Sequence, residues 1–368
     1  MPEWKRLVIF AGMMKLVVEK LGRFCKTHRS LLCLLVLAVG VWLIQSSPVL
    51  GEAYSRYLYP VVATVLTAVS RFVPFSLYDL LIVAAVAGMV LVLVGVALRR
   101  LSWRKALKGV FYTVGWLYVA FYWLWGMNYF RQNFYVRNQL PRTEVCDWLY
   151  FDFTRDYIMQ YNQSVSLAGE PDTALLRPLS KEGYERLSRQ LKIYPPYWAA
   201  QPKPMLLSRV MAKMGIKGYI GAYFNEPLVS TCLLPHEYPF TYLHEMAHVM
   251  GISSEAEANL YAFLIGSESG DAAVRASAYS ALFGYVMGNA RRILSPEQYQ
   301  ELLEMVSPQA RELYEKEYEH WRNLYSSTLG DVQERLYDWF LKNNRVTSGT
   351  QNYSEVIGYL LAYRQRFP

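Results

Sequence analysis

The sequence predicts a mainly α-helical protein in two parts, an N-terminal three-helix transmembrane region and an α-rich domain with a small β-hairpin. Long uncharged apolar runs occur only in the first 130 residues, helical periodicity dominates the remainder, and one short segment has the composition of strands. We therefore expect a membrane domain over residues 1–130 and an extracytoplasmic domain over residues 131–368.

Three apolar segments of the first part are candidates for membrane spans, which need roughly 20 residues of helix. A fourth run, residues 57–70, is uncharged over 14 residues and contains Pro60. Its length is typical of an interfacial helix that lies along the membrane surface. The predicted spans lie near residues 31–47, 80–98 and 109–130.

The charge distribution indicates how the chain is oriented. Residues 1–108 contain 14 Lys/Arg and 4 Asp/Glu, whereas the remaining residues contain 24 and 26. Basic loops favour the cytoplasmic side, and three spans place both the N-terminus and the basic loop 99–108 there. We therefore expect a multi-pass protein of the bacterial inner membrane, with the lipid bilayer as a partner and its C-terminal domain outside the cytoplasm. The near-neutral second part gives no electrostatic reason to expect nucleic-acid binding.

Apolar residues at three- and four-residue spacing predict helices through most of the second part. Residues 216–233 differ, because β-branched and aromatic residues flank the turn signal Asn225-Glu226-Pro227, and they predict a β-hairpin. The Pro-rich residues 195–204 predict a loop before it. The predicted helices span residues 145–165, 180–193, 271–294, 297–325, 330–343 and 352–366.

Two cysteines, Cys146 and Cys232, lie in the part expected outside the cytoplasm. Disulfides persist in such compartments, so a bridge between them is one possibility. Two free buried thiols are the other, because the sequence gives no distance between them.

Residues 244–248 read His-Glu-Met-Ala-His, on a helix predicted over residues 239–250. One helical turn separates His244 from His248, so both imidazoles can bind one Zn²⁺ as metal ligands. Glu245 is then placed to act as the general base for a metal-bound water. Gly251 is a suitable C-terminal stop for the helix. The pattern therefore predicts a catalytic zinc site with Glu245 as the catalytic residue.

A catalytic zinc site usually has a third protein ligand, and two carboxylates follow the motif, Glu255 and Glu257. Ser254 and Glu257 have the spacing of a capping box, which gives Glu257 a structural role. Glu255 is therefore the preferred metal ligand, with Glu257 and a purely helix-stabilising role for Glu255 as alternatives. Asn259, one turn after Glu255, is placed to hydrogen-bond a ligand histidine.

The other histidines are weaker candidates. We expect His28 at the surface, His236 in a turn or cap, and His320 on a solvated helix face. Oxyanion stabilisation is an alternative role for His320, and Tyr219 and Tyr223 of the hairpin are rival donors.

Several segments together resemble a known family. They are the run LPHEYPFTYLHEMAHVMGISSEAEANLYAFL, the LWGMNYFR end of the third span, the GxxGxY hairpin and the YDWFLKNN segment. The family is an uncharacterised bacterial one of three-span membrane proteins of unknown function with HExxH and ExEAN motifs, usually described as zinc metallopeptidases.

The resemblance implies a gluzincin-like site in which Glu255 completes the zinc site and Asn259 is its motif partner. One departure is that only six residues separate His248 from Glu255, fewer than is usual for gluzincins. The HExxHxxG portion is instead similar to metzincins, whose third ligand would fall on Ser254, a poor zinc ligand.

The leading hypothesis is a membrane-anchored zinc metallopeptidase that hydrolyses peptide bonds of a protein or peptide substrate outside the cytoplasm, with Glu245 as general base. The hairpin could present an edge strand to an extended substrate. The alternative is a non-hydrolytic membrane-bound zinc-binding scaffold or envelope-assembly factor, against which Glu245 argues because a structural site needs no base. Intramembrane proteolysis is disfavoured, because the motif lies over 100 residues beyond the last predicted span.

Overall fold

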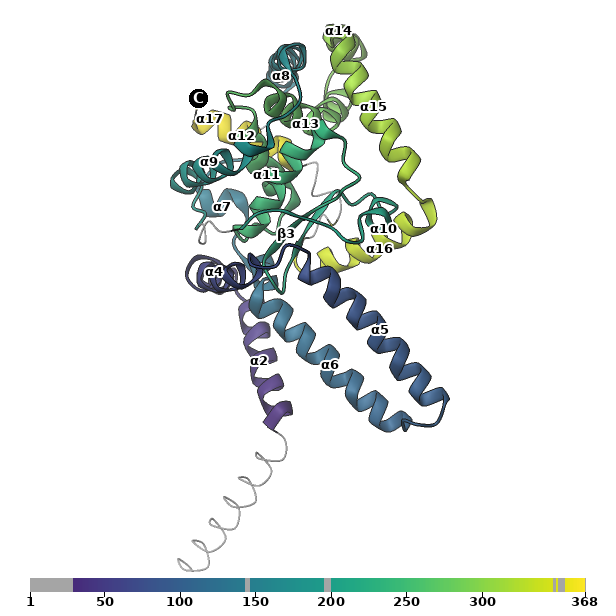
Figure 1. Cartoon of the computed structure of the whole chain (residues 1–368). Coiled ribbons are helices and arrows are strands. Elements are labelled where there is room, and N and C mark those ends of the chain that lie inside the picture. Colours follow the sequence, from purple (N-terminus) through teal and green to yellow (C-terminus); the bar gives the residue numbers. More distant parts are fainter. Residues whose placement is uncertain (1–28, 143–145, 195–199, 347–348, 350–354, 368) are drawn as a thin grey trace, which may run out of the picture.

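A computed structural model of the protein describes residues 29–142, 146–194, 200–346, 349 and 355–367. Within these residues the chain is mainly helical, with one small mixed sheet of three strands. Three helices project from a larger body that contains most of the other elements (Figure 1). The basic N-terminus lies almost entirely outside the described residues.

The three projecting helices, which we call the stem, are α2 (Arg29–Gln45), α5 (Leu77–Ala97) and α6 (Trp103–Leu124). α5 and α6 run antiparallel and are joined by a short turn at the end far from the body (Figure 1). α2 packs on α6, where the Trp123 indole donates a hydrogen bond to the Leu37 carbonyl over 3.1 Å. These helices coincide closely with the three apolar segments of the sequence.

Only part of the membrane prediction is confirmed. Among the described helices, α5 alone is long and apolar enough to cross a membrane by itself. Counting α2 and the following segment Pro48–Ser70 as one broken span, bent by 106°, gives a second. α6 falls short because basic residues occupy its first turns and its tyrosines and tryptophans have low hydropathy. The described residues thus contain one helix, or two if the bent pair is counted, that could cross a membrane by length and composition.

The run at 57–70 forms the end of a π-helical turn (Tyr54–Leu58) and then α4 (Tyr59–Ser70), after the short α3 (Pro48–Ala53). α4 lies at the junction of α2 and the body (Figure 1). Pro60 is tolerated because it occupies the first turn of α4, where its missing N–H has no helical partner. Tyr59 faces the body, whereas Val61 and Val65 are exposed.

The helices of the body follow the predicted periodicity with one exception. The single helix predicted over 297–325 is two, because Pro308 begins a new helix and Ser307 caps it. The short helices are α7 (Phe134–Asn138), α10 (Ser208–Ala212) and the 3-10 turns Gly126–Phe130, Thr173–Leu175 and Pro235–Glu237. The long ones are α8 (Asp147–Leu167), α9 (Leu176–Gln190), α13 (Ala272–Ile293), α14 (Pro296–Met305), α15 (Pro308–Leu324), α16 (Ser327–Asn343) and α17 (Val356–Arg366).

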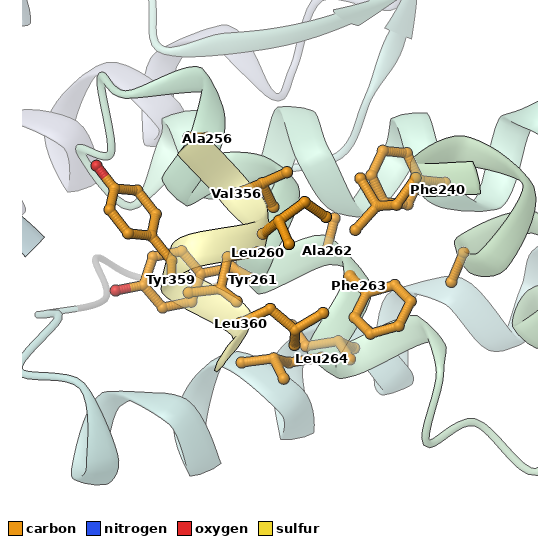
Figure 2. Packing of buried hydrophobic residues seen from close by; sticks show 14 of the residues in the cluster. Phe240, Ala256, Leu260, Tyr261, Ala262, Phe263, Leu264, Val356, Tyr359 and Leu360 are labelled. Carbon is orange, nitrogen blue, oxygen red and sulfur yellow. The ribbon is translucent and has the colours of Figure 1, made fainter. Parts of the chain in front are cut away.

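The core of the body surrounds α12 (Glu255–Gly266), all of whose residues are buried. Figure 2 shows Leu260 and Phe263 of α12 packed with Leu360 of α17. The neighbouring α11 (Tyr238–Val249) is also almost wholly buried, and the Tyr184 hydroxyl donates to the Leu243 carbonyl over 2.7 Å. The two helices that carry the predicted site are therefore held rigidly by the core.

A hairpin is present within the predicted range, but its turn lies at residues 222–225, because Glu226 and Pro227 of the predicted turn signal already belong to the second strand. β2 (Gly218–Gly221) pairs antiparallel with β3 (Glu226–Val229), around a turn in which Asn225 adopts a φ of 51°. β1 (Lys203–Pro204) pairs parallel with β3, although this segment was predicted as a loop. Residues 195–199 of the predicted loop lie outside the described residues. β3 is therefore central, and β2 is an edge strand.

The possible disulfide is not formed. Cys146 and Cys232 are both free thiols in the structure. Cys146 precedes α8 and Cys232 follows β3. The backbone carbonyl of Cys232 lies 2.7 Å from His320 Nε2. The predicted domain boundary at residue 130 stays a prediction, although it coincides with the end of the 3-10 turn Gly126–Phe130.

Candidate metal centre

The HExxH segment occupies the last two turns of α11, which ends before Gly251. Gly251 has a φ of 76°, a left-handed conformation that glycine adopts without steric cost, so the chain reverses there as predicted. His244, Glu245 and His248 bring their ligand atoms within 4.8 Å of one another. The helix thus presents both imidazoles and the neighbouring carboxylate to one point.

The turn after α11 brings the start of α12 back to the two histidines. Ser254 caps α12 by accepting a hydrogen bond from the Glu257 amide, so Glu255 is the first residue of the helix. Glu255 Oε2 lies 3.1 Å from His244 Nε2 and 3.6 Å from His248 Nε2. The two Nε2 atoms are 3.2 Å apart. Glu255 therefore meets both histidines, although it lies outside the HExxH motif.

These separations fit one tetrahedral ion. Zinc bonds to imidazole nitrogen and carboxylate oxygen measure about 2.0–2.2 Å, so two ligand atoms of a tetrahedral site lie roughly 3.3–3.5 Å apart. The three distances in the cluster, 3.1, 3.2 and 3.6 Å, fall close to that value. The residues present therefore suit a site with two imidazoles and one carboxylate, and one tetrahedral position left open.

Both histidines are oriented through their second ring nitrogen. His244 Nδ1 lies 2.8 Å from Asn259 Oδ1, and His248 Nδ1 lies 2.6 Å from the Ile252 carbonyl oxygen. Each oxygen accepts a hydrogen bond, so each Nδ1 carries the proton and each Nε2 presents its lone pair to the cluster. The predicted contact between Asn259 and a histidine of the motif is confirmed.

The second oxygen of Glu255 is held by a residue that the sequence reasoning missed. The Tyr337 hydroxyl of α16 donates a hydrogen bond to Glu255 Oε1 over 2.7 Å. Tyr337 lies 82 residues beyond Glu255, so no local spacing connects the two. The feature of the sequence that pointed to Tyr337 is its position in the YDWFLKNN segment, which carried part of the family resemblance.

The histidines and Glu255 shift one another's pKa values. Burial alone would raise the pKa of Glu255, but His248 and His244 outweigh it and hold that pKa well below its usual range. Burial alone would lower the pKa of His248, but the Glu255 carboxylate reverses this and raises it to about 9. These charges therefore favour an ionised Glu255, the form in which a carboxylate binds a cation.

Glu245 is in a different state from Glu255. Its side chain is only 2% exposed, and burial raises its pKa to about 7 despite the opposing effect of the histidines. Its Oε2 atom is buried and has no hydrogen-bond partner in the structure. A buried carboxylate oxygen without a partner is costly, which is typical of a functional group that waits for a ligand.

Gly218 of β2 makes room for Glu245. A Cβ atom at position 218 would overlap the Glu245 carboxylate, so only glycine fits this close approach of strand and helix. In the sequence, Gly218 is the first glycine of the GxxGxY pattern.

The cluster lies in a cavity of about 750 Å³. β2 and its preceding residue Lys217 line one side, and α16 and the ends of α5 and α6 line another. Lys217 is neutralised by two carboxylates, its Nζ lying 2.7 Å from Glu237 and 2.6 Å from Glu317. The cavity is therefore large enough for several residues of a peptide and carries no unpaired lysine there.

The remaining candidates are not part of the cluster. Glu257, the alternative ligand, forms a buried ion pair with Arg137, and its carboxylate does not fold back onto Ser254 as the capping box predicted. Tyr219 donates its hydroxyl to Asp79 and Tyr223 donates to the Leu117 carbonyl, so neither hydroxyl is free as an oxyanion donor in this structure. His320 binds the Cys232 carbonyl, His236 lines the cavity beside Glu317, and His28 lies outside the described residues.

Comparison with known proteins gives a family but no activity. The model of a family described as proteins of unknown function (DUF3810) matches residues 54–361. No curated protein and no solved structure matches the chain. Because the match covers most of its length, the chain belongs to the DUF3810 family, and the predicted membership of an uncharacterised family is confirmed.

Proposed function

We propose that this member of the DUF3810 family is a membrane-anchored zinc metallopeptidase, with His244, His248 and Glu255 as zinc ligands. One observation carries the proposal. The two imidazole Nε2 atoms and Glu255 Oε2 lie 3.1–3.6 Å apart, the spacing of ligands around one tetrahedral ion. Both Nδ1 atoms are engaged elsewhere, so the Nε2 atoms are the ring nitrogens left to bind an ion.

The kind of donor supports a catalytic rather than a structural zinc site. Two histidines and one carboxylate with an open position are typical of zinc peptidases, whereas structural sites are usually closed by four Cys or His ligands. Glu245, beside the cluster, leaves Oε2 without a partner. A structural site gains nothing from a buried, unpartnered carboxylate, because its burial costs free energy.

The chemistry divides between the ion and Glu245. Zinc, when bound, polarises the scissile carbonyl and lowers the pKa of a water molecule. Glu245 is positioned to take a proton from that water on Oε2 and to deliver it to the leaving amine. Gly218 lets Glu245 approach β2, so the base lies between the cluster and the edge strand.

A peptide substrate fits the edge strand. β3 pairs with one edge of β2, the other edge has no strand partner in the sheet, and residues 217–220 line the cavity. An extended peptide can therefore add to β2 as a further strand, which places a backbone carbonyl beside the cluster.

The stem supports membrane attachment by three spans. Most apolar side chains of α5 are exposed along its length, which is costly in water and favourable in lipid. The basic residues Arg99, Arg100 and Arg104 lie at the end of the stem far from the body. Basic residues favour the cytoplasmic side, so the body would lie outside the cytoplasm, with its substrate.

The test uses the full-length chain in detergent or nanodiscs with zinc. Wild type is expected to cleave members of a peptide library, read by mass spectrometry. Glu245→Gln should keep the zinc and lose hydrolysis by about 10²–10⁴-fold, the usual contribution of a general base. Glu334→Gln is the matched control, because Glu334 lines the same cavity but is exposed and lies outside the cluster.

Two results would contradict the proposal. Hydrolysis that survives in Glu245→Gln would remove the role of the base. Wild-type chain that binds zinc and cleaves no peptide would favour the zinc-binding scaffold.

A further inference from the structure

The cavity that holds the cluster is continuous with the stem. Its wall includes Tyr78 and Ile82 of α5, Phe121 of α6, and Trp125 and Tyr129 directly after α6. Three residues of the stem and two that directly follow it therefore face the same space as His244 and Glu245. A site meant only for soluble peptides has no need of a wall built from membrane-anchoring helices.

An apolar surface leads from the cavity along both helices. On α5, Val86 and Met89 follow Ile82 at helical spacing, on the same face and one and two turns further from the body, and both are exposed. On α6, Tyr118 and Val114 stand in the same relation to Phe121 and are exposed as well. The cavity therefore connects with the lipid-facing surface of the stem.

α16 forms a second boundary of the cavity and has two faces. Gln333, Tyr337 and Phe340 line the cavity. The stripe beside this lining, about a quarter turn round the helix, is apolar and exposed, with Leu336 at 63% and Trp339 at 67%, and it includes Leu329 and Val332. Such an amphipathic helix is typical of a membrane surface.

The position of α16 agrees with this assignment. The Phe340 ring lies 6.0 Å from that of Phe121 and 5.5 Å from that of Tyr129, and the Tyr122 hydroxyl donates to Asn344 over 2.8 Å. These contacts fix α16 at the body end of α6, and Figure 1 shows it beside the upper end of α5. The cavity therefore lies at the level where the stem leaves the body.

The charge of the cavity selects a polypeptide over a lipid. Glu237, Glu245 and Glu317 line it, and the nearby Lys217 is paired with the first and the last of them. Three carboxylates and one lysine leave this wall acidic, which disfavours a phosphate headgroup, whereas the backbone of a peptide can pair with β2.

We infer that the substrate is a polypeptide with an apolar membrane-anchoring segment, which lies between the body ends of α5 and α6 while the adjoining extended segment pairs with β2. The inference rests on the proposed function and names the substrate class of that site. The site then cleaves anchored proteins close to the membrane surface.

The test compares two forms of one substrate in proteoliposomes. A sequence cleaved in the library digest is made as a free peptide and as the same peptide joined to a 20-residue Leu/Ala membrane span, a length that crosses the bilayer. Ile82→Trp fills the cavity at the stem. Val83→Trp is the matched control, because Val83 is the next residue of α5, is exposed and does not line the cavity.

Wild type and Val83→Trp are expected to cleave the anchored form with a kcat/KM at least about tenfold above that of the free peptide, since the anchor adds a second contact. Ile82→Trp should lose this advantage, so that its kcat/KM for the anchored form falls to its own value for the free peptide. Zinc content and thermal unfolding check that Ile82→Trp is folded, and Ile82→Asn replaces it if it is not.

Equal cleavage of the two forms by wild type would overturn the inference and leave the proposed function intact. An anchored advantage that survives in Ile82→Trp, or that is lost equally in Val83→Trp, would also overturn it. If wild type cleaves no peptide of the library, the proposed function fails and the inference with it.

Discussion

The two walls of the cavity differ in what holds them and in what they can do. The polar wall, on α11 and α12, is a set of side chains fixed by hydrogen bonds, in which His244, His248 and Glu255 each have a defined partner. The apolar wall, on α5, α6 and α16, consists of aromatic and aliphatic side chains that continue onto exposed surfaces. The polar wall therefore carries the groups that can do chemistry, and the apolar wall determines how a substrate reaches them.

The largest effect is expected from the two carboxylates of α12. Glu255→Gln should lower zinc affinity by more than about a hundredfold, because loss of an outer partner alone already costs 10- to 100-fold. Glu257→Gln should keep the zinc but lower the free energy of unfolding by about 3 kcal/mol, since it leaves the Arg137 guanidinium buried without its counter-ion. Zinc titration and denaturant unfolding measure the two.

Glu255 and Glu257 therefore serve as controls for each other. The assignment of the ligand would be wrong if Glu257→Gln lost zinc in a folded chain, or if Glu255→Gln bound it as tightly as wild type.

The next effect concerns the base rather than the metal. Gly218→Ala should push the Glu245 carboxylate away from β2 and lower kcat by about 100-fold, the cost of a misplacement of roughly 1 Å. Zinc content should not change. Gly270→Ala is the control, because nothing lies within 4 Å of a Cβ atom there. Full activity in Gly218→Ala would show that Glu245 tolerates the shift and is not positioned by the strand.

A smaller effect is expected where α16 meets the polar wall. Tyr337→Phe removes the hydrogen bond to Glu255 Oε1 and should weaken zinc binding by about tenfold. Tyr219→Phe is the matched control, because Tyr219 lines the same cavity but its hydroxyl binds Asp79. A zinc affinity that falls equally in both variants would indicate a general loss of structure instead.

The smallest effect concerns the exposed face of α16. A fluorophore on Trp339→Cys, in a chain without its native cysteines, should be quenched by lipids brominated near the headgroup, because an interfacial helix buries its apolar face only about 5–10 Å deep. The same fluorophore on Tyr318→Cys should not be quenched, since Tyr318 is an exposed residue of α15 in the body. Equal quenching at both positions would contradict a membrane-facing α16.

The polar wall could largely be predicted, because its ligands are close in sequence. His244 and His248 share a helical face by spacing alone, and the capping residue Ser254 separated the roles of Glu255 and Glu257. The same reasoning failed for the Glu257 carboxylate, because its partner, Arg137, lies 120 residues away and outcompetes the backbone amide.

The apolar wall could not be predicted, because its residues meet only in the folded chain. Ile82 and Phe121 were expected to be ordinary residues of membrane spans, and the segment of Tyr337 was expected to be one more amphipathic helix. Pro308 divides a helix whose periodicity continues across it, and β1 has only two residues, too short for a pattern. Tertiary contacts, not local spacing, decide these features.

The central claim is the identity of the ligands around one zinc ion, and zinc K-edge X-ray absorption of the zinc-loaded full-length chain tests it most directly. The structure predicts two imidazole nitrogens and carboxylate or water oxygen at about 2.0–2.2 Å, without sulfur. A sulfur shell at about 2.3 Å, or a chain that takes up no zinc, would contradict it.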